Sequence, residues 1–239
     1  MAATDRRLCV ALAAVTLASA GAAQAQAQAY QCRIPGEVRV PDVQANSAPR
    51  DLPVTGYTLA LSWSPEFCRF REDERRHARQ CSGGKGRFGF TVHGLWPDSG
   101  RSWPQWCAGP KPTASAVRQN LCISPDAALM ARQWAKHGSC MTRRPETYFK
   151  VTRILYSGLR WPDFVRISRE ENLTAGTIRT RFADANEGWP EEAVGVHLDG
   201  KGWLEELRLC YDKRFMPKPC DTVRLGAKDG DRAKIWRGL

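Results

Sequence analysis

Cysteines are the feature that most restricts how this chain can fold. The sequence of 239 residues contains nine of them, and eight follow residue 27. These eight are Cys32, Cys68, Cys81, Cys107, Cys122, Cys140, Cys210 and Cys220. An even number of cysteines in a chain bound for an oxidising compartment predicts that all eight are paired in disulfide bonds. The number of cysteines does not show which cysteine is bonded to which.

Residues 1–27 have the pattern of a cleaved export signal. Arg6 and Arg7 precede an apolar run at residues 8–20, and alanines with glutamines follow. The run is too short to span a bilayer, and no later segment is apolar enough to be a membrane anchor. We therefore expect a protein exported to the periplasm or out of the cell, with residues 28–239 as its mature domain.

The chain has a strongly positive net charge, which favours a negatively charged binding partner. The formal net charge is +11 at pH 7, and loss of Asp5, Arg6 and Arg7 with the signal leaves +10. An exported basic protein often meets a polyanion, whether nucleic acid, anionic lipid or acidic glycan. Solubility alone also accounts for such a charge, so the charge by itself does not decide the function.

Hydrophobic patterning predicts an α+β domain without repeats or linkers. We expect strands at 57–63, 88–92, 193–198 and 203–211, with His93 at the end of the second and a hairpin turn at Asp199-Gly200. Ser124 as an N-cap before Pro125 predicts a helix ending near His137. Further helices are expected at 146–156, 161–169 and 175–186. Irregular or loop structure is expected at 30–54, 69–87, 95–122 and in the basic tail from 221.

Two segments carry candidate chemistry, and each contains one of only four histidines. The first is Phe90-Thr-Val-His-Gly-Leu-Trp-Pro-Asp98, and the second is Gln133-Trp-Ala-Lys-His-Gly-Ser-Cys140. Cleavage of RNA through its 2′-hydroxyl needs a base for that hydroxyl and an acid for the departing 5′-oxygen. Two histidines can supply both near neutral pH. His77 and His197 have no such neighbours and are interpreted as structural.

The second segment also brings further polar groups to one helical turn. Gln133 and His137 are four residues apart and share a helix face, and Arg132 and Lys136 have the same spacing on the adjacent stripe. Cations at this position also favour the helix dipole, which is the structural explanation for them. The functional explanation is stabilisation of the negative charge that develops on a phosphate in the transition state.

These residues resemble the ribonuclease T2 family of acid, metal-independent endoribonucleases. The similar segments are the two histidine motifs, Tyr57–Cys68 and Glu206–Lys213, so the likeness extends over about residues 55–220. The resemblance implies an α+β fold around a central antiparallel sheet, with helices packed on it in a single disulfide-stabilised domain. It also implies cleavage of single-stranded RNA with little base preference to give 2′,3′-cyclic phosphate ends. We expect a monomer that needs no cofactor and no metal.

The resemblance assigns roles residue by residue. His93 matches the general acid, His137 the general base and Lys136 the lysine that steadies the phosphate charge. Trp96 and Asp98 match positions that in some members hold and read the first base, although packing and loop capping are the competing explanations for them. Two further tryptophans of the loop, Trp103 and Trp106, are weaker candidates for the cleft.

Two disulfide bonds are expected individually. The resemblance favours Cys107–Cys140, and proximity in the sequence favours Cys210–Cys220, while Cys32, Cys68, Cys81 and Cys122 pair among themselves in an order that stays open. A zinc site at His137 and Cys140 is the competing interpretation. It is disfavoured because the chain has no Cys-x-x-Cys pair and export favours disulfides.

One departure from the family pattern affects the expected rate. The second motif usually begins His-Glu-Trp, whereas this chain has Arg132-Gln133-Trp134. An amide cannot carry a proton or raise the pKa of an imidazole by its charge, and an arginine does not titrate. We therefore expect slower cleavage with a pH profile less tied to acid conditions, and we keep Gln133 and Arg132 as weak catalytic candidates.

Other functions remain as alternatives. The main one is a weakened or inactive RNA-binding or toxin-like protein on the same fold, motivated by the missing glutamate. A cysteine or serine hydrolase is disfavoured because no Gly-x-Ser-x-Gly elbow is present. A metal-dependent nuclease is disfavoured because neither motif offers clustered carboxylates.

Overall fold

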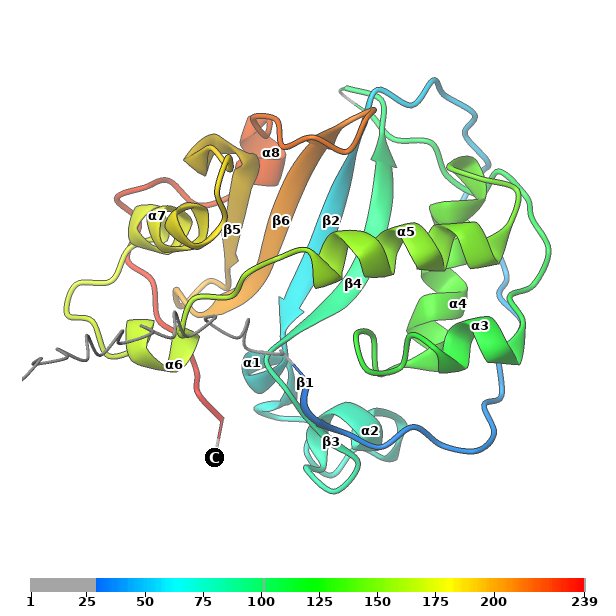
Figure 1. The fold of residues 1–239 in the computed structure, drawn as a ribbon, viewed down its shortest axis with the longest axis horizontal. Coiled ribbons are helices and arrows are strands. Elements are labelled where there is room, and N and C mark those ends of the chain that lie inside the picture. Colours follow the sequence, from blue (N-terminus) through cyan, green and yellow to red (C-terminus); the bar gives the residue numbers. More distant parts are fainter. Residues whose placement is uncertain (1–28, 101, 239) are drawn as a thin grey trace, which may run out of the picture.

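An antiparallel sheet forms the centre of the molecule (Figure 1). The computed structural model describes residues 29–100 and 102–238, so the expected export signal lies outside the described residues. The main sheet has, in spatial order, β4 (Phe90–Asp98), β2 (Gly56–Trp63), β6 (Leu204–Asp212) and β5 (Val194–Leu198). A small second sheet pairs β1 (Ala29–Cys32) with β3 (Gly86–Phe88).

The two faces of the main sheet differ in character because side chains alternate along each strand. Leu59, Leu61, Leu207 and Leu209 point to one face and are fully buried. The helices α5 (Pro145–Ser157) and α7 (Ala175–Ala185) lie over this face (Figure 1). Polar and small residues occupy the opposite face, which therefore has room for a site.

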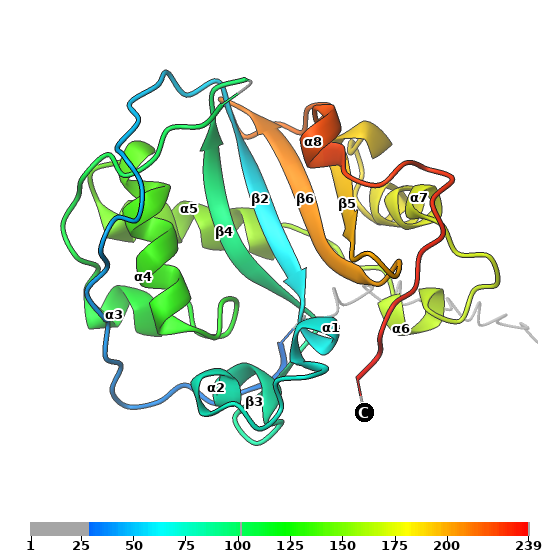
Figure 2. The same ribbon diagram turned by 180° about the vertical axis from the view of Figure 1, so that it is seen from behind.

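Helices surround the sheet on both sides. The α-helices besides α5 and α7 are α1 (Ser64–Cys68), α2 (Ala78–Cys81), α3 (Ala114–Arg118), α4 (Ala127–Lys136), α6 (Phe164–Ile167) and α8 (Thr222–Leu225). The 3-10 helices are η1 (Arg75–His77), η2 (Gly138–Cys140) and η3 (Glu191–Ala193). Seen from behind, α8 lies beside the ends of β5 and β6 (Figure 2). None of the helices in these described residues combines the length and apolar character needed to cross a membrane.

The second predicted strand is longer than expected, and His93 is not at its end. β4 continues to Asp98, and a register shift leaves His93 without a partner on β2, since Val92 pairs with Leu61 and Gly94 with Ala60. Such a bulge turns a side chain out of the regular alternation. The prediction failed because glycine and proline in this stretch resemble loop residues, but Pro97 lies on an edge strand, where it is tolerated.

The N-cap of α4 is also different from the prediction. Asp126, not Ser124, caps the helix, and its carboxylate accepts hydrogen bonds from the backbone N–H groups of Ala128 and Leu129 at 2.8 and 3.1 Å. Ser124 instead belongs to the preceding turn, where its N–H donates to the carbonyl of Asn120. One acceptor that reaches two free N–H groups is the better cap.

The other predicted helices and strands are present, but the loop predicted at 95–122 contains α3 and the basic tail from residue 221 contains α8. The predicted helices at 146–156 and 175–186 and the two C-terminal strands are confirmed within a residue or two. The helix predicted at 161–169 shortens to α6, and the loop predicted at 69–87 contains η1, α2 and β3. The predicted α+β class and central antiparallel sheet are confirmed.

All eight cysteines of the described residues are paired. The structure confirms Cys107–Cys140 and Cys210–Cys220, and it settles the open order with Cys32–Cys122 and Cys68–Cys81. The bond from Cys32 ties the irregular N-terminal segment to the loop before α4. Because a cross-link reduces the conformational freedom of the unfolded chain, these bonds stabilise a fold with long irregular segments.

Candidate active site

The polar face of the sheet carries a cavity of about 960 Å³. Both predicted catalytic histidines line it, His93 from β4 and His137 from the end of α4. Gln133 and Lys136 of α4 line it as well, so the structure brings together residues from the two predicted segments. A cavity of this size with a few converging polar groups is the usual form of a ligand site.

His93 is held by a carboxylate that the sequence analysis did not single out. Its Nδ1 lies 2.8 Å from Oε2 of Glu206, which is 8% exposed and lies on β6. The other oxygen of Glu206 accepts a 2.7 Å hydrogen bond from Nε of Arg208. Burial raises the pKa of Glu206, but the hydrogen bond and charge of His93 and the charge of Arg208 outweigh it, so the pKa is lowered. The ionised carboxylate fixes the ring with Nδ1 toward Glu206 and leaves Nε2 for the cavity.

His137 differs from His93 in its surroundings, because it is buried next to positive charges. It is the C-cap residue of α4, it is 7% exposed, and among the described residues its Nδ1 has no hydrogen-bond partner. Burial lowers its pKa to about 3, helped by the positive charges of Lys136, His93 and Arg132. The ring is therefore neutral at pH 7, which is the state that a general base requires.

Trp96 joins the two histidines. Its ring centroid lies 5.2 Å from that of His93 and 5.7 Å from that of His137. Its indole N–H donates a 2.7 Å hydrogen bond to Oε1 of Gln133, and the guanidinium of Arg208 lies over its ring. A Cβ on residue 94 would overlap both Gln133 and Trp96, which explains the glycine between the histidine and the tryptophan. Gln133 therefore orients Trp96 through its amide oxygen.

Two cations stand beside His137. Lys136 and Arg132 both line the cavity, and the guanidinium of Arg132 lies 5.8 Å from the ring centroid of Trp106. Burial lowers the pKa of Lys136, and the charges of Arg132 and Arg50 lower it further. Two positive groups this close together repel each other, so they are a favourable place for an anion such as phosphate.

The disulfide Cys107–Cys140 fixes the end of the helix that carries His137. Cys140 belongs to η2, directly after His137, and Cys107 belongs to the loop that contains Trp106. The backbone N–H of Trp106 also donates a 2.8 Å hydrogen bond to the carbonyl of Lys136. The loop and the helix end are therefore joined both covalently and by a hydrogen bond.

Most of the chain matches one known protein family. The sequence pattern of the ribonuclease T2 family matches residues 55–220, the stretch that contains both histidines. The chain belongs to the ribonuclease T2 family.

Two bacterial relatives are identical to this chain at about a third of the aligned positions. A probable ribonuclease of Haemophilus influenzae is 31% identical over 186 residues, which cover 71% of this chain and 62% of that protein. A ribonuclease of Aeromonas hydrophila is 36% identical over 163 residues, which cover 66% of this chain and 71% of that protein. The matched part thus falls short of two thirds of the Haemophilus protein.

Solved structures show the same fold. The S-like ribonuclease trichomaglin superposes with a TM-score of 0.61 at 22% identity, over 74% of this chain and 96% of that one. RNase NT, solved in complex with 5′-AMP, superposes with a TM-score of 0.54 at 20% identity, over 77% of this chain and 98% of that one. The central sheet of the T2-family chain is therefore shared with ribonucleases of low sequence identity.

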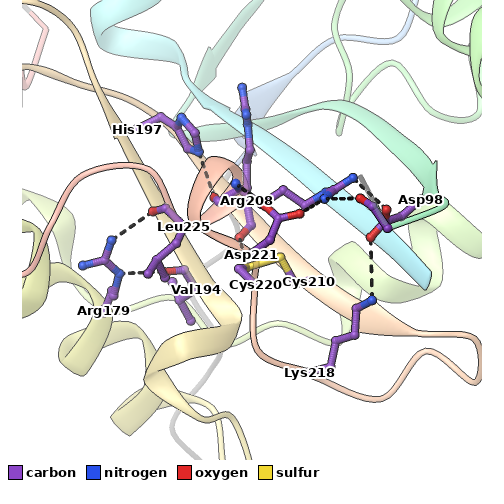
Figure 3. Close-up of a disulfide and its surroundings, with 12 residues drawn as sticks. Asp98, Arg179, Val194, His197, Arg208, Cys210, Lys218, Cys220, Asp221 and Leu225 are labelled. Carbon is purple, nitrogen blue, oxygen red and sulfur yellow. Dashed lines mark hydrogen bonds and ion pairs between the residues drawn. A yellow bond between two sulfur atoms is a disulfide. The ribbon is translucent and has the colours of Figure 1, made fainter. Parts of the chain in front are cut away.

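Asp98, expected from the T2 resemblance to read a base, is part of an ion-pair cluster. It is 4% exposed, Nη2 of Arg224 lies 2.8 Å from its Oδ1, and Nζ of Lys218 lies 3.6 Å from its Oδ2. All three side chains line the cavity (Figure 3 shows Asp98 and Lys218). Each carboxylate oxygen carries two lone pairs, so Asp98 can accept a further hydrogen bond from a ligand besides those of its two cations.

The two tryptophans of the loop differ in position. Trp103 is 41% exposed and lines the cavity, and its ring faces the guanidinium of Arg50 at 4.7 Å. Trp106 is 7% exposed, and its indole N–H donates to Ser47. Its ring packs beside Arg132 rather than lining the cavity, because the bond to Ser47 and the nearby disulfide hold it under the loop.

Sequence reasoning missed the residues that come from the C-terminal part of the chain. Glu206, Arg208, Lys218 and Arg224 all contact residues of the site, yet none of them lies in a histidine motif. The one usable signal was that Glu206 and Arg208 lie in the segment Glu206–Lys213, which resembles the family. His77 and His197, interpreted as structural, do not line the cavity, and within the described part of the chain no group of three or more His, Cys, Asp or Glu residues is arranged to hold a metal ion.

Proposed function

We propose that this T2-family ribonuclease is an exported endoribonuclease that cleaves single-stranded RNA with low base specificity. It does so by transesterification at the 2′-hydroxyl, without a metal, and leaves 2′,3′-cyclic phosphate ends. The observation that carries the proposal is that two imidazoles line one cavity beside Lys136, one bonded to a buried carboxylate and the other buried next to cations.

The reaction needs a proton acceptor at the 2′-hydroxyl, and His137 fits this role. Burial and neighbouring cations keep its ring neutral. When an anionic phosphate binds beside Lys136 and Arg132, it offsets their charge and raises the pKa of His137 from its depressed value. The ring then takes the 2′-hydroxyl proton while the 2′-oxygen attacks phosphorus.

The leaving 5′-oxygen needs a proton, and His93 fits that role. Its Nδ1 is engaged by Glu206, so a protonated ring delivers its proton from Nε2 as the bond between phosphorus and the 5′-oxygen breaks. The carboxylate compensates the positive charge that the ring carries before this transfer. The product is the cyclic phosphate, with His137 protonated and His93 neutral, and proton exchange with water restores both.

Lys136 and Arg132 stabilise the transition state. The phosphorane carries more negative charge on its oxygens than the substrate does, and a fixed cation beside it lowers the barrier. Gln133 occupies the place of the usual family glutamate, and its carbonyl oxygen is engaged by Trp96. We therefore propose that Gln133 contributes by holding Trp96 against both imidazoles rather than by carrying a proton.

The test is cleavage of RNA by the purified mature protein in the presence of EDTA, with analysis of the new ends. We expect internal cleavage and 2′,3′-cyclic phosphates. His93→Ala and His137→Ala should each lower kcat by about 10²–10⁴-fold, the usual size of a general acid or base effect. His77→Ala, a histidine that contacts Phe67 away from the cavity, is the matched control and should retain the parental rate.

Two outcomes would contradict the proposal. Binding of RNA without cleavage by the parent protein would favour a non-catalytic RNA-binding protein on the same fold. Cleavage that survives both histidine substitutions would point to a contaminating nuclease. Export is tested separately by N-terminal sequencing of the protein recovered from the periplasm or medium, which should begin near residue 28.

A further inference from the structure

The segment after Cys220 forms one wall of the site cavity although it lies beyond the part of the chain that matches the T2 family. The family pattern ends at residue 220, and residues 221–224 line the cavity. In this segment Asp221 caps α8 and pairs with the guanidinium of Arg224, which also reaches Asp98 on β4. The contact between Arg224 and Asp98 spans 126 residues of sequence.

Contacts with β5 and with α7 hold the backbone of Arg224 and of the residues that follow it. His197 Nε2 lies 2.9 Å from the carbonyl oxygen of Arg224, and Ala227 N–H donates to the carbonyl of Val196 on β5 (Figure 3 shows His197). A Cβ on residue 195 would overlap the carbonyl of Arg224, so the close approach requires Gly195. The backbone position of Arg224 is therefore built into the fold.

Arg179 secures the same segment from α7. It is only 2% exposed, and its guanidinium donates to the carbonyls of Val194 at 3.0 Å and Leu225 at 2.9 Å (Figure 3). It also donates to the carbonyl of Ala227 and pairs with Asp229. Three backbone carbonyls therefore accept hydrogen bonds from one buried arginine, and two of them belong to the segment that follows Arg224. These bonds fix the position of that segment against α7 and β5.

The corner made by Asp98, Lys218 and Arg224 offers both acceptors and donors. Asp98 keeps carboxylate lone pairs, Lys218 has three N–H groups and one carboxylate neighbour, and both line the cavity. Thr58, on the floor of the cavity, is 1% exposed and has a hydroxyl without a hydrogen-bond partner among the described residues. These groups line the cavity and keep hydrogen-bonding capacity that a ligand can use.

Guanine has the edge that complements this corner. Its O6 accepts a hydrogen bond, and its adjacent N1–H and N2–H groups donate in parallel, which suits a carboxylate beside a cation. Adenine presents a single amino donor, and uracil presents one N–H between two carbonyls. We propose that Lys218 and Arg224, acting with Asp98, make guanine the preferred base at one side of the scissile bond, within an otherwise broad specificity. This inference rests on the proposed function, because the preference is expressed in cleavage.

The experiment uses DNA oligonucleotides that contain a single ribonucleotide, so that only one bond can be cut. One set varies that ribonucleotide among guanosine, inosine, adenosine, uridine and cytidine, and a second set varies the nucleotide on its 3′ side. At one of these positions we expect kcat/KM for guanine to exceed that for adenine by about tenfold, with inosine between them because it lacks the N2 amino group.

Substitutions assign the preference to the corner. Arg224→Met and Lys218→Met should each move the guanine-to-adenine ratio toward one, and Asp98→Asn should remove the difference between guanine and inosine. Arg214→Met is the matched control: it also removes an arginine, which is exposed and does not line the cavity, and it should keep the parental ratio. If Arg224→Met does not fold, Lys218→Met carries the test, because the backbone N–H of Lys218 still donates to Cys210.

Equal cleavage of the guanine and adenine substrates in both sets would overturn the inference and leave the proposed function standing. A guanine preference that survives Arg224→Met and Lys218→Met would also overturn it. If no oligonucleotide is cut, the proposed function fails, and titration with 5′-GMP and 5′-AMP then tests the corner directly. Tighter binding of 5′-GMP supports the inference, and equal affinities overturn it.

Discussion

His93 and His137 line the same cavity, but they differ in burial and in the charge of their neighbours. His93 is half-exposed and bonded to a buried carboxylate, which is in turn bonded to Arg208. His137 is buried beside cations, and its Nδ1 has no partner within the described residues. The difference shows how one fold can keep one imidazole oriented to give a proton and another neutral to take one.

Among changes to the surroundings of the two histidines, the largest effect should come from removing the carboxylate partner of His93. Glu206→Gln should lower kcat by about 10–100-fold, a size typical of a group that orients a functional histidine, with a smaller change in KM. Glu206→Asp, which keeps the charge, should recover part of the rate. The pH–rate profile of the glutamine variant should change on the limb that reports His93.

A double-mutant cycle decides whether Glu206 acts through His93. In a His93→Ala background, Glu206→Gln should have little further effect, whereas in a His137→Ala background it should still lower the residual rate. Equal effects in both backgrounds would show that Glu206 supports the sheet rather than the acid.

The second effect is a gain in rate from giving His137 a charged neighbour. Gln133→Glu keeps an oxygen for the Trp96 N–H and adds a negative charge one helical turn before His137. The charge raises the pKa of His137 and should increase kcat by about tenfold, or about one pKa unit. Because the base is then protonated at a higher pH, the acid limb of the pH–rate profile should move to higher pH. Homopolymer RNA cleaved across pH 4–9 measures both. An unchanged rate and profile would refute this account of Gln133.

A smaller effect should follow from opening Cys107–Cys140. This bond holds the helix end at His137 and does not touch His93. The double variant Cys107→Ser/Cys140→Ser should therefore lose several-fold in activity at temperatures where its far-UV circular dichroism is still native. Loss of activity that follows global unfolding would show instead that the bond only stabilises the fold.

The smallest effect concerns stability in acid. The pKa of His137 is about 3 in the folded protein against 6.5 as its ordinary value. The neutral buried ring therefore contributes stability that is fully present above pH 6.5 and is lost as pH falls toward 3, by at most about 1.4 kcal/mol per pH unit. The free energy of unfolding of His137→Asn should fall less steeply than that of the parent over this window. His77→Asn is the control and should follow the parent.

How far the sequence predicts the site depends on which contacts are local. His93 and His137 were found because their neighbours in sequence form two specific motifs, and the helix places Gln133, Lys136 and His137 on one turn. The expected N-cap at Ser124 and the strand end at residue 92 were wrong, because a cap or strand end is decided by which backbone N–H groups are free after packing. Trp106 was a candidate for the cleft and is instead buried beneath the loop.

By itself the sequence determined the family resemblance, the expectation that all eight cysteines after residue 27 are paired, and the two histidines. Only the tertiary structure decided how those histidines differ. Glu206 is 113 residues from His93, and Arg224 is 126 residues from Asp98. Sequence periodicity reports which face of its own helix or strand a residue occupies, but neighbours from distant strands are set by register and by the path of the chain. Burial, which gives His137 its low pKa, likewise exists only once those strands and helices have packed.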